Sequence, residues 1–471
     1  MTLRFFAAGV MDLDTRRNVA RMGCDMQDAR QRQRRRRFSF LAWLCLILLP
    51  LVGMAQEEAT PSDRPLRDEP GLEARRQRYA SHPAKSIALF PVRVIELPFQ
   101  LLNYPVEHWF VRKRPEPLTE KVVVFLRAAE EDGVSIEARL ESGHSGFGGG
   151  VGYRLPHSLT GPVNLRFFGG ATNRGYQQYF VQLDTLRVGS ANLWLRGQYL
   201  DLAQESYYGP LGIDSELDQR SNYELQIASA ILYGEIAGDP TFKLTFDGGF
   251  SRNDARPGEN DEFPTTHSLF AGVEGLDERL DFVEGGLALV WDRRDNPTYT
   301  NRGSFAQASV HLVGGVGDTD NSFAKYGLEV RQYLPLPGAR RTLGLRIAGM
   351  ITDNFADAEI PFFRLERLGG SRTLRGVQTY RFSDKDMLRG GLEYRFPFWF
   401  IGLENGAAID ALAFFDFGTV MPNLEEVTWR DLQPTGGFGF RIVARDRVFV
   451  RTDFAWSEED SRVHIGFGSL H

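Results

Sequence analysis

A short, repeated alternation of side chains constrains this chain more than any other feature. From about residue 134 onward, segments of roughly ten residues alternate apolar side chains with small or polar ones. In 145–155, for example, Phe147 and Val151 share one face, whereas glycines and Arg154 occupy the other. This period of two is typical of strands that separate an apolar environment from a polar one. Because charged inner faces are costly in a dry core but suit a wet lumen, the pattern predicts an all-β fold, a transmembrane antiparallel β-barrel.

The predicted strands number about sixteen, an even number as in bacterial barrels. They begin near residues 134, 145, 163, 176, 189, 221, 241, 279, 302, 323, 341, 385, 406, 434, 448 and 462. Short connections such as 444–447 alternate with long ones such as 253–278 and 353–384, which predicts a periplasmic end and an extracellular end. A soluble β-sandwich is the alternative, but it would need each inward charge to be neutralised separately.

The N-terminal region predicts export from the cytoplasm. A basic run, 34–37, precedes an apolar stretch, 38–55, which Pro50 interrupts. This order is that of a secretory signal peptide, residues 1–55, with cleavage before Gln56; an uncleaved anchor is the alternative. No later segment resembles a transmembrane helix, so periplasm, secretion or an outer-membrane barrel are the possible destinations. Together with the strand pattern, this predicts the outer membrane of a Gram-negative bacterium.

Charge and cysteine content exclude several classes of function. Cys24 and Cys45 both lie within 1–55, so the exported chain would have no disulfide framework and no cysteine-based zinc site. Removal of 1–55, which carries ten arginines and four aspartates, changes the formal net charge from −6 to about −12. An acidic chain is a poor partner for nucleic acid. The eight histidines show no metal-ligand spacing, and we predict neither a metal nor a cofactor.

A short region, 56–120, lies between the signal peptide and the barrel, which we assign to 121–471. Within it, 86–110 has apolar residues at steps of three and four, with polar residues following the same period on the opposite face. The apolar positions are Leu89, Val92, Ile95, Phe99, Leu102, Val106 and Phe110, and prolines at 91, 98 and 105 would kink a helix. The pattern predicts an amphipathic periplasmic segment packed under the barrel or lying at the membrane interface, in preference to a gated plug.

Four motifs lie in a defined order along the predicted barrel. They are "ESYYGPLG" (205–212), "WDRRDNPTYTNRG" (291–303), "LGGSRTLRGV" (368–377) and "LAFFDFGTV" (412–420). Each motif alone is weak, but their order over most of the barrel resembles the BamA/TamA superfamily of outer-membrane assembly barrels, also called the bacterial surface antigen family. Three positions depart from the family pattern: Pro210 is inserted, Thr300 replaces a proline and Val377 replaces an aromatic residue.

The resemblance implies a role for the third motif. In that family the corresponding loop, between the eleventh and twelfth strands, folds into the lumen, and its arginine pairs with inward carboxylates. Here this arginine is Arg375, and the strand alternation turns Glu393 and Asp416 inward as its predicted partners. Gly369, Gly370 and Gly376 would let the backbone turn sharply and approach the wall. The alternative is a solvated loop arginine.

The resemblance also implies a periplasmic turn and a weak seam. The turn motif consists of Asp292, Arg294, Asp295, Asn296, Pro297 and Gly303. The seam would lie between the first and last strands, with Val134, Ile136, Ile465 and Phe467 as its side chains. Through such a seam the family inserts or translocates polypeptides, and its members are themselves assembled by the barrel assembly machinery.

One departure leaves the function open. The family handles its clients with periplasmic POTRA repeats, and 56–120 is too short and too rich in proline for one repeat. We therefore expect outer-membrane lipids and a periplasmic or envelope protein as partners; the alternative is a stand-alone pore, scaffold or surface protein. A barrel enzyme using Ser145 with His144 or His267 is not favoured, because "GHSGF" (143–147) lacks the last glycine of a nucleophile elbow.

Overall fold

The computed structural model describes the barrel and a small part of the region before it. The described residues are 95–96, 134–140, 145–155, 164–317, 321–338, 340–355, 359–402, 407–444 and 447–467. The chain forms two compact units, Met1–Glu58 and Ala59–His471, and all described residues belong to the second. The predicted signal peptide, 1–55, and all of 86–110 except Ile95 and Glu96 lie outside the described residues. Within the described part, no helix has the length and apolar character needed to cross a membrane.

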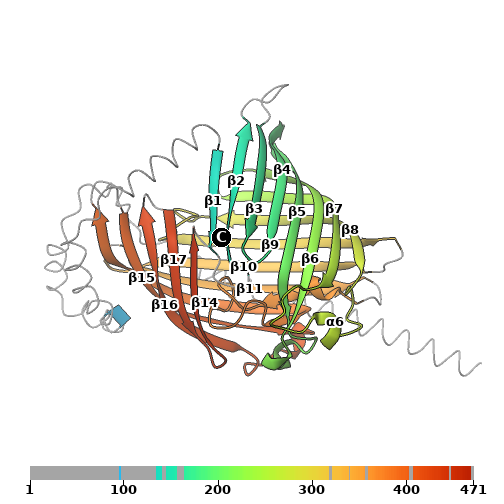
Figure 1. Cartoon of the computed structure of the whole chain (residues 1–471). Helices are drawn as coiled ribbons and strands as arrows, with labels where there is room; N and C mark the ends of the chain where they lie inside the picture. The colour runs from blue at the N-terminus through green and yellow to red at the C-terminus, as the bar shows by residue number, and fades with distance from the viewer. Residues whose placement is uncertain are drawn as a thin grey trace, which may run out of the picture. The chain divides into compact units, whose positions relative to one another are not determined.

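Sixteen antiparallel strands form one sheet, as the alternation predicts (Figure 1). They are β1 (Val134–Leu140), β2 (Phe147–Leu155), β3 (Asn164–Thr172), β4 (Gln177–Val188), β5 (Ala191–Tyr207), β6 (Ser221–Ala237), β7 (Phe242–Pro257), β8 (Arg279–Asp292), β9 (Gly303–Val316), β10 (Phe323–Pro335), β11 (Thr342–Asn354), β14 (Asp386–Gly402), β15 (Ala407–Met421), β16 (Gln433–Ala444), β17 (Arg447–Trp456) and β18 (Ser461–Phe467). Each strand begins within about two residues of its predicted position, because the period of two is strong in all of them.

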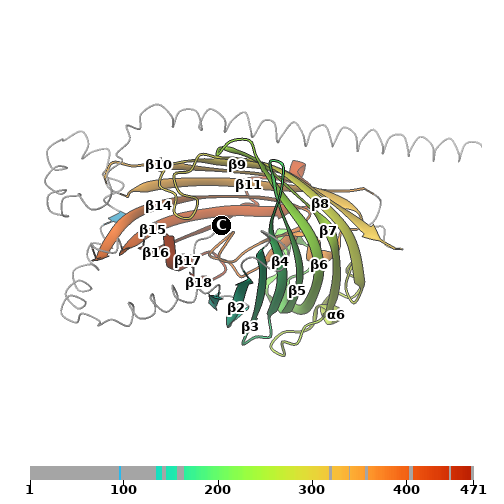
Figure 2. The ribbon, with the colours of Figure 1, turned by 90° about the horizontal axis from the view of Figure 1, so that it is seen from above.

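The sheet is an up-and-down meander that curls round on itself. Each strand pairs with the next along the chain, and only between β11 and β14 does the chain leave the sheet. There it forms a separate hairpin of β12 (Glu366–Leu368) and β13 (Phe382–Asp384). Seen from above, the strands bend round so that the two ends of the sheet face each other (Figure 2). The curling brings the two edge strands, β1 and β18, close to each other.

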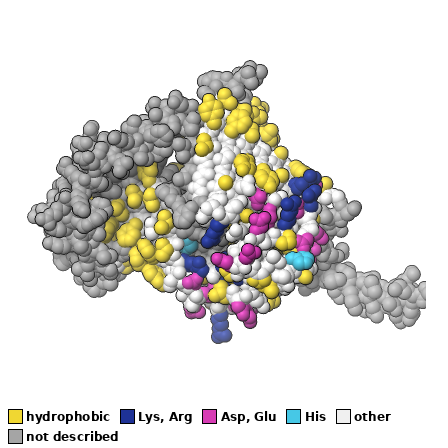
Figure 3. Space-filling view, in the orientation of Figure 1, with side chains coloured by type: hydrophobic (Ala, Val, Ile, Leu, Met, Phe, Trp, Pro, Cys, Tyr) yellow, Lys and Arg dark blue, Asp and Glu magenta, His cyan; other side chains and the backbone are white. Residues whose placement is uncertain are grey.

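The outward face of the sheet is apolar. Large hydrophobic side chains on it are exposed, among them Val151 at 59% and Leu287 at 52%. Others are Tyr179, Val181, Val283, Leu289, Leu312, Leu392, Phe415, Ile442, Val463 and Ile465. Figure 3 shows hydrophobic side chains over β2–β4 and over β15–β17. A protein with an apolar surface of this extent would aggregate in water. The outer face of a transmembrane barrel, which contacts lipid, requires such a surface.

Two long connections differ from the predicted ones. β7 pairs with β6 as far as Pro257, so the loop predicted for 253–278 begins only after that residue. It contains the short helix α6 (Thr266–Leu269). The connection 353–384 carries the β12–β13 hairpin, which the alternation does not reveal because three-residue strands are too short for a period to be recognised. Between the barrel strands the structure also describes 3₁₀ turns: η2 (Gly212–Asp214), η3 (Leu217–Gln219), η4 (Phe362–Arg364) and η5 (Leu424–Glu426).

The outward face gives a first test of the fold. Leu287→Arg places a charge on the lipid side of β8 and should destabilise the barrel by about 2–4 kcal/mol if Leu287 lies near the bilayer midplane. Leu287→Phe is the matched control, because it keeps an apolar side chain toward lipid. Unfolding of both variants in lipid vesicles, followed by heat-modifiable gel mobility, measures the difference. Equal stability of the two variants would contradict a lipid-facing Leu287.

Candidate functional site

The connection between β11 and β14 lies inside the barrel. We call its described residues 359–385 the lumen loop. Leu368, Leu374, Val377 and Phe382 of this loop are fully or almost fully buried, and they pack against Met387 of β14 and Val420 of β15. Ile360, Phe362 and Phe363 join a second buried cluster with side chains of β5–β10. Apolar burial therefore holds the loop against opposite sides of the wall.

The Arg375 side chain of the lumen loop contacts carboxylates of two neighbouring strands. Its Nε and Nη2 donate to Oδ2 and Oδ1 of Asp416 at 2.7 and 2.8 Å, a bidentate pair. Its Nη1 donates to Oε2 of Glu393 at 3.1 Å and lies 3.9 Å from Oδ1 of Asp453. The guanidinium carbon lies 3.4 Å from the centre of the Phe414 ring. We call Arg375 with Asp416 and Glu393 the clasp.

The strand register explains why these carboxylates meet. Glu393 of β14 pairs with Phe414 of β15, and Gly391 pairs with Asp416, so all four point to the same face. On the intervening positions, Leu392 and Phe415 are exposed on the outer face. The clasp therefore requires both strands to be in this register, since a slip of either strand by one residue would turn its own carboxylate toward lipid.

The glycines beside Arg375 permit close approach of backbones. A Cβ on Gly376 would lie 2.6 Å from the carbonyl oxygen of Trp456, the last residue of β17. The Gly376 carbonyl accepts a hydrogen bond from Oγ of Ser457 at 2.9 Å. Gly369 has φ +117°, and a Cβ there would lie 1.9 Å from a backbone oxygen; Gly370 has φ +87°. Side chains at these positions would force the lumen loop away from its present path.

Further cations of the lumen loop contact other strands, and the sequence analysis missed these pairs. Arg364 contacts Glu284 of β8 at 3.1 Å, Arg367 contacts Glu205 of β5 at 3.2 Å, and Arg381 contacts Glu459, after β17, at 2.8 Å. Lys325 of β10 donates to Glu366 of the loop at 2.6 Å. Glu205 lies in the "ESYYGPLG" motif, which could have indicated a structural role. The partner in each case depends on how the loop crosses the lumen, which the alternation does not specify.

Two contacts connect the clasp to the last strands of the sheet. Asp453 of β17 is fully buried and forms an ion pair with Arg441 of β16 at 2.7 Å. His464 of β18 lies with Nε2 2.7 Å from the carbonyl oxygen of Arg375. The same alternation that turns Asp416 inward also turns Asp453 inward, so this signal was available in the sequence.

The β8–β9 turn is organised by the side chains of its motif. Arg294 donates to both carboxylate oxygens of Asp292, at 2.8 and 2.7 Å. Oδ1 of Asp295 accepts backbone N–H groups from 296, 301 and 302, and Oδ1 of Asn296 accepts those of 298 and 299. Gly303 has φ +107° and would clash with the backbone of residue 293 if it carried a Cβ. Pro297 lies in the same turn and lines the lumen cavity described next.

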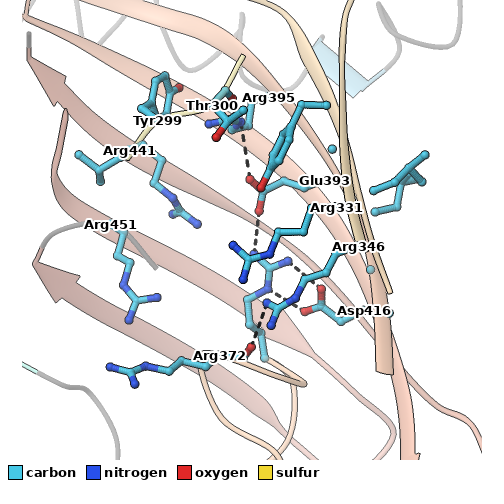
Figure 4. Close-up of a pocket in the computed structure, with 18 of the residues that line it drawn as sticks. Tyr299, Thr300, Arg331, Arg346, Arg372, Glu393, Arg395, Asp416, Arg441 and Arg451 are labelled. Atoms are coloured by element: carbon cyan, nitrogen blue, oxygen red, sulfur yellow. Dashed lines mark hydrogen bonds and ion pairs between the residues drawn. The ribbon is translucent and has the colours of Figure 1, made fainter. Parts of the chain in front are cut away.

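The β8–β9 turn enters the lumen at the end of the barrel opposite to the lumen loop. Tyr299 is almost fully buried, and its hydroxyl donates to Oδ2 of Asp410 on β15. Arg340 also contacts Asp410, at 2.7 Å, and the Arg395 guanidinium lies 4.4 Å from the centre of the Tyr299 ring. A cavity of about 170 Å³ lies between the turn and the lumen loop, and Figure 4 shows the side chains around it.

The seam strands are described only in part. In the described residues the fifteen ladders join each sheet strand to the next in the order β1 to β18, and none joins β1 with β18. Nevertheless, some Cα atoms of the two strands approach within 8 Å. Ile465 is exposed on the outer face. The side chains of Val134, Ile136 and Phe467 lie outside what the structure describes.

Glu96, from the region before the barrel, lies against the outside of the wall. It is 3% exposed, and its carboxylate accepts hydrogen bonds from Arg341 at 2.8 and 3.1 Å and from the Tyr394 hydroxyl at 2.6 Å. Tyr394 alternates with the inward Glu393 and so belongs to the outer face, yet it is 6% exposed, whereas Leu392 on the same face is 41% exposed. Arg341 follows the short β10–β11 turn, so this contact lies at the end of the barrel with the short turns.

The residues considered for catalysis lie on different elements. Ser145 precedes β2, and His267 lies in α6, where Nδ1 contacts Oδ2 of Asp277. His144 lies outside the described residues. In the part of the chain that the structure describes, no hydrogen bond joins Ser145 with His267.

A comparison of the sequence with models of known protein families identifies the family of this chain. The model of the Omp85 superfamily domain matches residues 132–444, which is more than half of the chain. No curated protein sequence matches the chain at a significant level.

Solved structures resemble the fold at low sequence identity. BamA from Haemophilus ducreyi lacking POTRA domains 1–3 aligns with a TM-score of 0.55 and 15% identity, over 72% of this chain and 70% of that one. CdiB from Acinetobacter baumannii and CdiB from Escherichia coli align at 12% identity, with TM-scores of 0.46 and 0.48. The alignments cover 71% and 72% of this chain but only 59% and 62% of the two CdiB chains. The resemblance predicted from the four motifs is thus confirmed, and the chain belongs to the Omp85 superfamily.

Proposed function

We propose that this protein is an outer-membrane barrel that assists insertion or translocation of polypeptides through the seam between β1 and β18. The observation that carries the proposal is the difference between this seam and the rest of the sheet. Each of the other neighbouring pairs is joined by a hydrogen-bonded ladder, whereas none joins β1 to β18 in the described residues. Unpaired strand edges are ready to accept a further strand, and a client segment could pair there by β-augmentation.

A stand-alone pore is the second function that the sequence leaves open. The lumen loop with its buried side chains fills the lumen from the end with the long loops. Tyr299 and the β8–β9 turn enter from the other end. An open aqueous conduit is therefore disfavoured, and we favour the polypeptide-handling role.

In this proposal the clasp keeps the seam side of the barrel in place. Arg375 holds β14 and β15 through its side chain and β18 through its carbonyl oxygen. The loop thereby connects strands on both sides of β16 and β17. A barrel with an unzipped seam needs such internal support, because its edge strands lack one row of hydrogen bonds.

In this proposal a periplasmic partner binds to the region before the barrel. Glu96, one of the two described residues of 86–110, contacts Arg341 and Tyr394 at the end of the barrel with the short turns. A segment held there would lie beside the place where a polypeptide arrives from the periplasm. We infer that 86–110 contributes the docking surface for which other members use POTRA repeats.

The seam can be tested by locking it. Ile136→Cys with Ile465→Cys places one thiol on each strand of the seam, and gel mobility identifies the disulfide-linked form after oxidation. If 1–55 is removed as predicted, the exported chain has no other cysteine. Oxidation should abolish insertion of an eight-stranded outer-membrane barrel into vesicles containing the protein, and a reductant should restore it. Gly197→Cys with Ala230→Cys is the matched control, because these positions pair within the closed β5–β6 ladder. Full activity of the oxidised seam variant would rule out a role for the seam.

The clasp is tested by Arg375→Ala. This change leaves the carboxylate of Asp416 buried without its partner, and it should destabilise the barrel by about 3–5 kcal/mol. Arg252→Ala is the matched control, because Arg252 makes the same bidentate contact with Asp281 but is exposed. Its loss should leave the stability of the barrel close to that of wild type, because an exposed ion pair is screened by solvent. Heat-modifiable mobility and protection of the lumen loop from protease measure both; wild-type values for Arg375→Ala would contradict the clasp.

Attachment of 86–110 is tested by Glu96→Ala. Loss of the three hydrogen bonds should destabilise the contact by about 1–3 kcal/mol, since Tyr394 and Arg341 lose their acceptor. Protease cleavage within 86–110 should become faster, and recovery of crosslinked envelope proteins with the barrel should fall. Glu107→Ala changes another acidic residue of the same segment and serves as control. If both variants behave alike, Glu96 has no special role in attachment.

A further inference from the structure

The cavity between the lumen loop and the β8–β9 turn has an excess of positive charge. Among the described residues that line it, nine are arginines and two carry carboxylates, Glu393 and Asp416. The arginines are Arg294, Arg331, Arg346, Arg372, Arg375, Arg389, Arg395, Arg441 and Arg451. Several of them are compensated: Arg294 by Asp292, Arg375 by the clasp and Arg441 by Asp453. The excess is concentrated on one wall, formed by β10, β11 and β14.

On this wall two of three guanidinium groups share one carboxylate. Arg331 of β10 and Arg346 of β11 are directly opposed in the ladder. The Nε atoms of both lie 2.8 Å from the same oxygen, Oε1 of Glu329. Figure 4 shows both side chains in the cavity. Like charges directly opposed across a ladder are destabilising unless an anion lies between them, and Glu329 supplies only one negative charge.

Arg389 of β14 is the third cation, and it forms no ion pair with a carboxylate among the described residues. Its Nη1 donates to the carbonyl oxygen of Arg372 at 3.0 Å, and Nη1 of Arg346 approaches the same oxygen at 3.5 Å. The two guanidinium groups therefore converge on one point. The Nε of Arg389 is buried without a hydrogen-bond partner, and no carboxylate of the described residues lies within ion-pair distance of this side chain. The trio thus retains two uncompensated positive charges beside a cavity.

We propose that this wall binds a small phosphate-bearing anion, held by Arg346 and Arg389 with Arg331 behind them. Arginine binds phosphate well because its planar guanidinium group donates two parallel N–H groups to two oxygens of the phosphate. A phosphate dianion matches the two uncompensated charges, and it has enough acceptor oxygens for the unpaired Nε of Arg389. A cavity of about 170 Å³ is large enough for a phosphate group but not for a folded client. The site is independent of the seam and of the role proposed for it.

Phosphate binding can be measured on the full chain purified in a non-ionic detergent. Inorganic phosphate should show ³¹P line broadening on addition of protein and should raise the temperature at which heat-modifiable mobility is lost, relative to chloride at equal ionic strength. Arg389→Gln and Arg346→Gln should weaken phosphate binding at least tenfold. Arg279→Gln, which changes an exposed arginine at the start of β8, should leave it unchanged.

A second readout separates binding from a structural role. If Arg389 is held beside like charges, Arg389→Gln should unfold at the same or a higher temperature than wild type without phosphate, and it should lose the increase that phosphate causes. A variant that unfolds at a lower temperature in both buffers would indicate a structural arginine and overturn the proposal. Absence of broadening with wild type, or equal affinity in Arg389→Gln, would overturn it as well.

Different phosphate compounds distinguish a free phosphate ligand from a lipid headgroup. Glycerol phosphate and short-chain phosphatidylglycerol are titrated beside inorganic phosphate. Binding of inorganic and glycerol phosphate supports a free phosphate compound as the ligand. Binding of phosphatidylglycerol alone, lost in Arg389→Gln, supports a lipid headgroup that reaches the same arginines. Binding of phosphatidylglycerol that Arg389→Gln does not change would place the lipid elsewhere and contradict the site.

Discussion

The pairing of Arg375 with Asp416 and Glu393 is the interaction on which the interior depends. A guanidinium taken out of bulk water is stabilised only where carboxylates are already held in place, and here two neighbouring strands hold them. The pairing fixes the path of the lumen loop, and the loop then reaches β5, β8 and β10 through its other charged residues. Together with the apolar clusters, these ion pairs join the lumen loop to strands that are not neighbours in the sheet.

The interior is closed from both ends, and this shapes what the barrel can do. The lumen loop enters from the end with the long loops, and the β8–β9 turn brings Tyr299 to Asp410 from the other. The space left between them is small and lined by arginines. In the described residues no ladder joins β1 with β18, so the proposed route for a polypeptide runs through the side of the barrel and not along its axis. The contact of Glu96 with Arg341 and Tyr394 lies on that outer side as well.

Much of the fold could be predicted because the alternation of side chains along a barrel strand shows which residues face the lumen and which face lipid. Leu392 and Phe415 are exposed while Glu393 and Asp416 are turned inward, as the alternation predicts. The β12–β13 hairpin could not be predicted, since a three-residue strand has no measurable period. The partners of Arg364 and Arg381 were also missed. They lie 80 and 78 residues away in sequence, and nothing local specifies them.

The sequence by itself therefore determined the number of strands, their faces and the family, because each follows from a local period or a short motif. Only the tertiary structure decided which charges meet across the lumen. Arg389 shows the difference: its inward direction follows from alternation, but its lack of a carboxylate follows from how Arg331 and Arg346 share Glu329. Charge compensation is a property of distances between strands and loops, and these are set only when the sheet curls and the loop folds into it.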